Sequence, residues 1–82
     1  MNINKLKHKA KTLQPVIRIG KNGLNENVHK EIKKLLKKRK LIKIKILNNC
    51  PVDKNSLIEE ILKKSKSNLI SRIGNIFSIH RN

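Results

Sequence analysis

The stretch IRIGKNGLNENV, residues 17–28, decides how the fold of this chain is interpreted. Its first residues are β-branched and predict a short strand, which runs into a loop with a glycine at each end, Gly20-Lys21-Asn22-Gly23. Asn25 can then cap a helix that starts directly after the loop. Glycine lacks a Cβ, and helix N-termini attract anions. The unit therefore predicts a loop that a sugar-phosphate backbone can approach closely.

Taken alone, a GxxG loop is a weak signal, because most strand-to-helix turns need a glycine. The loop does not fit the G-x-x-x-x-G-K-[ST] pattern of nucleotide-binding loops or the G-x-G-x-x-G pattern of dinucleotide sites. Its context strengthens the signal, since it lies between a predicted strand and a predicted helix and is flanked by the two most basic segments. The GxxG loop of KH domains clamps a nucleic-acid backbone in a comparable position.

The rest of the chain predicts one α/β domain over residues 1–82 with the element order α-β-α-β-α-β-β. Helices follow from apolar residues three or four positions apart: Ile3, Leu6, Ala10 and Leu13; Val28, Ile32, Leu35 and Leu36; and Leu57, Ile58, Ile61 and Leu62. Strands are predicted in PVIRIG (15–20), LIKIKIL (41–47), NLISRI (68–73) and IFSIH (76–80). Right-handed crossovers then place the second and third helices on one face of a four-stranded mixed sheet.

Short signals define the ends of these elements. Pro15 ends the first helix, Asp53 caps the third, and Gly74-Asn75 predicts a tight hairpin. In residues 41–47 isoleucines alternate with Lys43 and Lys45. One face of the sheet is therefore expected to be packed, and the other at least partly open and basic.

The charge of the chain is strongly positive and unevenly distributed. There are 21 basic and 5 acidic side chains, a formal net charge of +16, and residues 1–45 alone carry 15 basic and 2 acidic ones. An AT-rich genome would explain the abundance of lysine, isoleucine and asparagine, but it does not explain why so few acidic residues accompany the lysines. The asymmetry predicts a polyanionic partner, most simply a nucleic acid.

Several other classes of protein are disfavoured. A single cysteine, Cys50, excludes an intramolecular disulfide, and no apolar run approaches a membrane span, so we expect a cytoplasmic protein without a membrane partner. The basic, amphipathic N-terminal segment leaves a membrane-surface or targeting role as a minor alternative. His8, His29 and His80 form no recognisable constellation with the carboxylates, so we expect no enzyme, cofactor, metal or small-molecule substrate. His8 and His29 fall on lysine-rich faces and are expected to be solvated or to face phosphates.

Three segments of the chain resemble a known family: residues 13–24, 41–47 and 72–81. They are similar, in order and spacing, to the stand-alone CRM domain of the small bacterial and archaeal YhbY-type proteins and of plant organellar splicing factors. The matching residues are Leu13, Pro15, Val16, Gly20, Gly23, Leu24, Ile42, Lys43, Lys45, Gly74 and Arg81. The last strand has Ile79-His80-Arg81 where the family often has Leu-Tyr-Arg, which weakens any base-stacking role at His80. The turn at 65–68 lacks the usual Thr-Gly.

The resemblance implies an RNA-binding module whose fold is similar to the C-terminal domain of bacterial translation initiation factor three. It implies an association of single-domain members with ribosomal RNA in large-subunit precursors and of multi-domain members with intron RNA. It also implies that the loop at residues 20–23 is the main RNA contact.

We expect binding by lysine–phosphate contacts, because the only aromatic residue, Phe77, is better explained as core than as a stacking platform. The predicted RNA-binding residues are Gly20, Lys21, Asn22 and Gly23 of the loop, Lys5 and Lys9 of the first helix, and Lys30, Lys33 and Lys37 of the second. The protein is expected to be a monomer. The alternatives are a basic DNA-coating or chromatin protein and a chaperone of tRNA or intron RNA.

Overall fold

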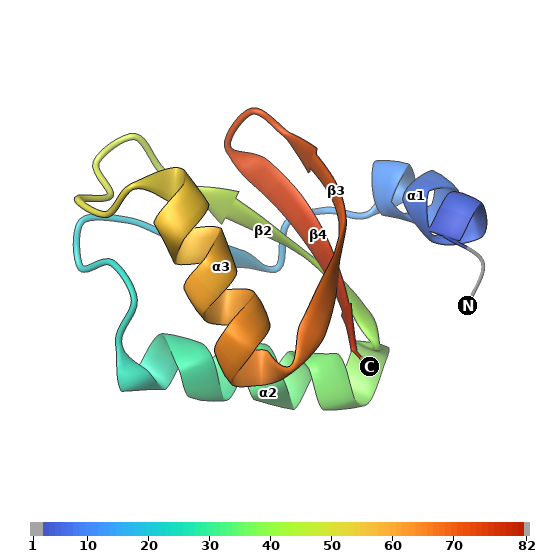
Figure 1. Ribbon diagram of the computed structural model, residues 1–82, viewed down its shortest axis with the longest axis horizontal. Helices are drawn as coiled ribbons and strands as arrows, with labels where there is room; N and C mark the ends of the chain where they lie inside the picture. The colour runs from blue at the N-terminus through green and yellow to red at the C-terminus, as the bar shows by residue number, and fades with distance from the viewer. Residues whose placement is uncertain (1–2, 82) are drawn as a thin grey trace.

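The computed structural model describes residues 3–81 and contains the predicted elements in the predicted order (Figure 1). They are α1 (Ile3–Thr12), β1 (Ile17–Ile19), α2 (Glu26–Arg39), β2 (Leu41–Ile46), α3 (Lys54–Ser65), β3 (Ser67–Ile73) and β4 (Ile76–Arg81). The strands form one four-stranded sheet in the order β1-β2-β4-β3, in which β1 and β2 are parallel and the other neighbours antiparallel. The α/β class and the mixed sheet are therefore confirmed.

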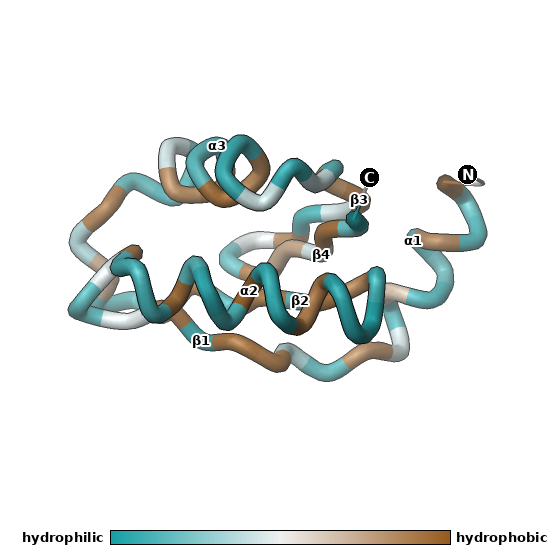
Figure 2. Tube along the Cα trace, turned by 90° about the horizontal axis from the view of Figure 1, so that it is seen from below, coloured by the Kyte–Doolittle hydropathy of each residue, from teal (hydrophilic) through white to brown (hydrophobic). Residues whose placement is uncertain are grey.

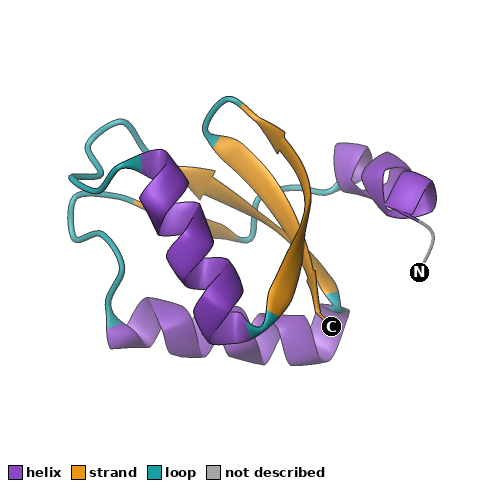
Figure 3. Ribbon diagram, viewed as in Figure 1, coloured by secondary structure: helices purple, strands orange, loops and turns teal. Residues whose placement is uncertain are grey.

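Helices α2 and α3 pack together on one face of this sheet, as predicted (Figure 3). The core between the helices and the sheet consists of Ile17, Ile19, Ile32, Leu36, Ile42, Ile44, Ile46, Leu57, Ile58, Ile61, Phe77 and Ile79. Period-two alternation in the strands and the apolar stripes of the helices place these side chains on facing surfaces. Phe77 is only 1% exposed, which confirms its place in the core.

The opposite face of the sheet is less open than its lysines suggest, because α1 covers part of it. The Lys43 ammonium donates hydrogen bonds to the carbonyls of Ala10 (2.8 Å) and Leu13 (3.3 Å) at the end of this helix. Of the predicted α1 stripe only Ala10 is buried, at 1% exposure, whereas Ile3 is 46% exposed. Lysines can satisfy the last carbonyls of a helix, so Lys43 is a structural residue on this face.

The predicted helix caps and the hairpin turn are confirmed. The Asn25 side chain accepts a hydrogen bond from the Val28 N–H at 2.9 Å, and the Asp53 carboxylate accepts one from the Ser56 N–H at 3.1 Å. Gly74 has a φ of +60° at the first central position of the turn between β3 and β4. None of the helices within residues 3–81 combines the length and the apolar composition that crossing a membrane requires.

Candidate nucleic-acid interface

The GxxG loop lies at the sheet edge where β1 and β2 both end. Because these neighbouring strands are parallel, the segments that follow them leave the sheet side by side, joined by a 2.8 Å hydrogen bond from the Leu47 N–H to the Ile19 carbonyl. The loop itself closes as a turn, with the Gly23 N–H donating to the Gly20 carbonyl at 2.9 Å. Lys21 and Asn22 occupy the centre of this turn, and both are exposed.

The structure explains the two glycines by their surroundings within the protein, whereas the sequence predicted that they let a ligand approach closely. A Cβ on Gly20 would lie 3.3 Å from the Asn49 side chain, and a Cβ on Gly23 would lie 3.4 Å from Val52. Gly23 also has a φ of +61°, a region that L side chains rarely adopt. At Gly20 the missing side chain leaves room for the Asn49 and Leu47 side chains, and at Gly23 the backbone conformation favours glycine. Lys21 and Asn22 are the exposed side chains of the turn, and their hydrogen-bonding groups are unused within residues 3–81.

The N-terminus of α2 offers less to an anion than the sequence suggested. The Val28 N–H already donates to the Asn25 side chain, and the Gly23 N–H donates within the loop. Glu26 adds a negative charge in the first helical turn. The cap thus occupies one N–H group of the first helical turn, and the Glu26 carboxylate lowers the attraction of this end for an anion.

The predicted lysines of α2 continue from the loop end of the molecule. Lys30, Lys33 and Lys37 are exposed and lie three and four positions apart, so they share one side of the helix. Figure 2 looks onto α2 and shows hydrophilic residues along its outer side. Lys30 and Lys33 line a groove of about 240 Å³ between α2 and α3, to which Lys64 of α3 also contributes. Lys64 was not among the predicted RNA-binding residues.

His29 also lines this groove, and the structure corrects its expected role. Its Nε2 lies 3.1 Å from Glu60 Oε2, and its side chain is only 13% exposed. The imidazole thus joins α2 to α3 and is not a solvated group on a lysine face. Glu60 and Lys64 are four residues apart and therefore lie on one side of α3. The spacing alone does not show which helix this side contacts.

Lys5 and Lys9 do not lie beside the GxxG loop. Helix α1 lies at one end of the molecule, whose longest dimension is 33 Å, and the loops after β1 and β2 lie at the other end. Figures 1 and 2 show this separation from two directions. The lysines of α1 are therefore remote from the GxxG loop, whereas α2 runs from the loop toward the end of the molecule where α1 lies. We call the group formed by Lys21, Asn22, Lys30, Lys33, Lys37 and Lys64 the loop–α2 surface.

Asn48 and Asn49 lie near the GxxG loop and were not among the predicted RNA-binding residues. Both are exposed in the segment after β2, and the Asn49 side chain lies beside Gly20. In open α/β sheets the carboxyl ends of neighbouring parallel strands carry binding sites. Cys50 follows, half-buried against the core as a free thiol. Residues 3–81 contain no cluster of three or more His, Cys, Asp or Glu side chains that could hold a metal ion.

Comparison with known proteins agrees with this architecture. Residues 1–81 match the CRS1 / YhbY (CRM) domain family. The chain is 41% identical over 76 residues to the Probable RNA-binding protein YqeI of Bacillus subtilis, covering 93% of this chain and 79% of that protein. It is 36% identical over 76 residues to a protein of Haemophilus influenzae named RNA-binding protein, covering 93% and 77%.

A solved structure extends the likeness to the fold. The solution structure of the hypothetical protein SAV1595 from Staphylococcus aureus superimposes with a TM-score of 0.80 at 36% sequence identity, over 98% of this chain and 83% of that one. The sheet order, the GxxG loop between β1 and α2, and the match over nearly the whole sequence lead to one assignment. This chain belongs to the CRS1 / YhbY (CRM) domain family.

Proposed function

We propose that this chain is an RNA-binding protein that contacts the backbone of structured RNA through the loop–α2 surface. The observation that carries the proposal is the turn at residues 20–23, which holds Lys21 and Asn22 outward at the end of the molecule where α2 begins. Relatives in the same family are named as RNA-binding proteins, which supports RNA over duplex DNA.

Binding rests on phosphate contacts. Each exposed lysine supplies a mobile ammonium, and Asn22 can both donate and accept hydrogen bonds. Phe77 is buried, so the face carries no aromatic platform on which bases could stack. Contacts of this kind fix the position of an RNA backbone and carry little sequence information. The protein then recognises the shape of a folded RNA and needs no cofactor.

The RNA that we propose is ribosomal RNA in precursors of the large subunit, bound by a cytoplasmic monomer. Support comes from the family resemblance of the single-domain type and from the charge of +16, which suits a partner with a dense phosphate backbone. Sedimentation of native extract at moderate salt tests this role. Co-migration with large-subunit precursors is expected, whereas a peak with free RNA would remove the ribosomal role and a peak with chromosomal DNA would favour a DNA-coating protein.

The loop–α2 surface itself is tested by Lys21→Glu combined with Lys33→Glu. Both side chains are exposed, so the variant should keep its circular-dichroism spectrum and its melting temperature while RNA affinity falls at least a hundredfold, since it reverses two phosphate contacts (~1.4 kcal/mol per tenfold). The matched control is Lys38→Glu with Lys63→Glu, two exposed lysines outside the surface with the same change in charge. Equal losses in the two double variants would show that net charge, and not this surface, determines binding.

A further inference from the structure

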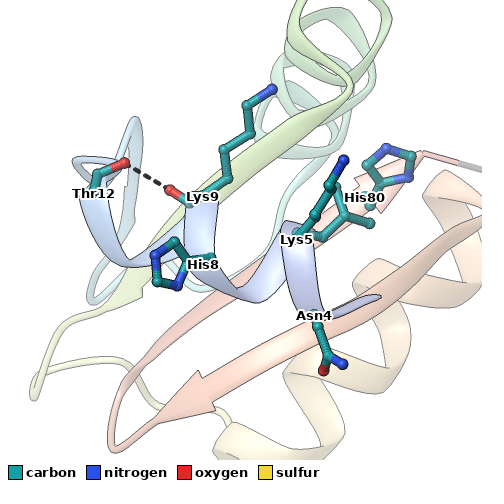
Figure 4. A pocket seen from close by; sticks show the side chains of 7 residues that line it. Asn4, Lys5, His8, Lys9, Thr12 and His80 are labelled. Atoms are coloured by element: carbon teal, nitrogen blue, oxygen red, sulfur yellow. Dashed lines mark hydrogen bonds between the residues drawn. The ribbon is translucent and has the colours of Figure 1, made fainter. Parts of the chain in front are cut away.

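A second basic depression lies at the opposite end of the molecule from the GxxG loop, between α1 and β4. It is an open depression of about 890 Å³, and most of the side chains that line it are exposed. It is lined by Asn4, Lys5, Leu6, His8, Lys9, Thr12 and His80. Figure 4 shows these side chains around the depression, with the Thr12 hydroxyl donating a 2.9 Å hydrogen bond to the Lys9 carbonyl. We call this depression the α1–β4 pocket.

The chemistry of the α1–β4 pocket suits a negatively charged ligand with an apolar part. Among the described residues its lining holds two lysines and two imidazoles and no carboxylate. The first acidic residue of the chain is Glu26, so α1 carries no competing charge. Leu6 and the aliphatic stems of Lys5 and Lys9 add apolar surface.

His80 of β4 contributes its imidazole ring to the lining of the pocket. Its Nδ1 is shielded from solvent and has no hydrogen-bond partner within residues 3–81. A buried N–H without an acceptor is rarer than a buried acceptor without a full set of donors. The neutral imidazole is therefore best arranged with its proton on Nε2, and the ring lines the pocket.

We propose that the α1–β4 pocket is a second RNA site that holds a single unpaired nucleotide. Its phosphate lies on the side chains of Lys9 and His8 with Lys5, and its base lies against Leu6 and the His80 ring, which donates a hydrogen bond to it. The proposal rests on RNA being the partner of the loop–α2 surface. An RNA that spans the 33 Å molecule and engages both ends gains affinity through the linkage, without any new contact.

The test is a nuclear magnetic resonance titration of the whole ¹⁵N-labelled chain with each of the four nucleoside 5′-monophosphates, with inorganic phosphate as the reference. A nucleotide should move the signals of His8, Thr12 and His80 further than phosphate does, at millimolar concentration. No shift in the pocket, or equal shifts from nucleotide and phosphate, would overturn the proposal.

Variants test whether the residues assigned to the pocket bind the nucleotide. Lys9→Gln and His80→Ala should each weaken nucleotide binding about tenfold, the loss expected for one charge-assisted or neutral hydrogen bond. Lys7→Gln is the matched control, because Lys7 is exposed on the same helix and does not line the pocket. An equal loss of nucleotide affinity in Lys7→Gln and Lys9→Gln would contradict a specific site in this pocket. Lys9 is exposed, so its variant stays informative even if His80→Ala does not fold.

The same titration with a folded RNA that has an unpaired loop distinguishes a failure of this proposal from a failure of the proposed function. Both are supported if the signals of residues 20–23 and those of the α1–β4 pocket move together. Movement at residues 20–23 alone would leave RNA binding standing and reject the second site. No movement anywhere would reject RNA binding itself, and with it the premise of the second site.

Discussion

Gly23 is constrained by its backbone conformation and not by lack of space. Its φ of +61° is unfavourable for any residue with a Cβ, and an added Cβ would lie in ordinary contact with Val52. Gly20 differs, because only the ends of the Asn49 and Leu47 side chains lie near its Cβ position and its φ is not in the positive region. The two glycines of the loop therefore have different structural roles, although the GxxG motif does not distinguish them.

We expect Gly23→Ala to lower the free energy of unfolding by about 1–2 kcal/mol, the cost of a left-handed conformation for a residue with a Cβ. Urea denaturation followed by circular dichroism measures it. Gly74→Ala is the reference, since its φ of +60° carries the same strain and nothing lies within 4 Å of its Cβ position. A loss at Gly23 close to that at Gly74, and a smaller one for Gly20→Ala, would agree with this account. A larger loss at Gly20 would contradict it.

Helix α1 shows how one element depends on a residue far away in the chain. It buries only Ala10, so its apolar contact with the sheet is small, and its last carbonyls rely on the ammonium of Lys43. The α1–β4 pocket exists only while α1 stays against the sheet. The stability of this docking therefore bears on function as well as on the fold.

Lys43→Met should weaken the docking of α1 by about 1–3 kcal/mol, because methionine keeps the stem but removes the charged donor from two carbonyls. Hydrogen exchange of the α1 amides is the direct measurement, and we expect faster exchange there than in α2 and α3. Lys45→Met is the control, since Lys45 lies two residues along the same strand, also half-buried, without such bonds to α1. Equal exchange in both variants would contradict the anchoring role.

Over the whole molecule, the positive charge should make RNA binding strongly dependent on salt. About five neutralised phosphates predict a log–log slope of affinity against salt of roughly −3.5 to −4.5. Lys21→Gln with Lys33→Gln should make this slope shallower by about 2, roughly 1 for each lysine. Fluorescence anisotropy over a salt series measures it, and an unchanged slope would show that these lysines do not meet phosphates.

The same charge should make the folded state more stable as salt is added. A net charge of +16 on 82 residues repels itself. Salt screens this repulsion, so the melting temperature of the free protein should rise with sodium chloride, each 1 kcal/mol gained adding about 4–8 °C. A falling melting temperature would mean that attractive ion pairs dominate.

The sequence by itself determined the elements and their order, because these follow from local rules. Apolar residues three or four apart in residues 26–39, alternation in 41–46, capping side chains at Asn25 and Asp53, and glycine at 74 act within a few residues of the chain. The mixed sheet followed from the same patterns, and the family followed from the resemblance of residues 13–24, 41–47 and 72–81 to its members. The loop at residues 20–23 was identified in the same way, and its part in RNA binding remains a prediction.

Only the tertiary structure decided which of these residues share a surface. In the sequence Lys5 and Lys9 are helical lysines like Lys30 and Lys33. In the structure, however, α1 and the GxxG loop lie at opposite ends of the molecule. Lys43 looks like an open lysine but anchors α1, and His29 looks solvated but contacts Glu60, 31 residues away. The physical reason is that local patterns fix which side of an element is apolar, whereas packing between elements distant in the chain fixes what each polar side chain meets.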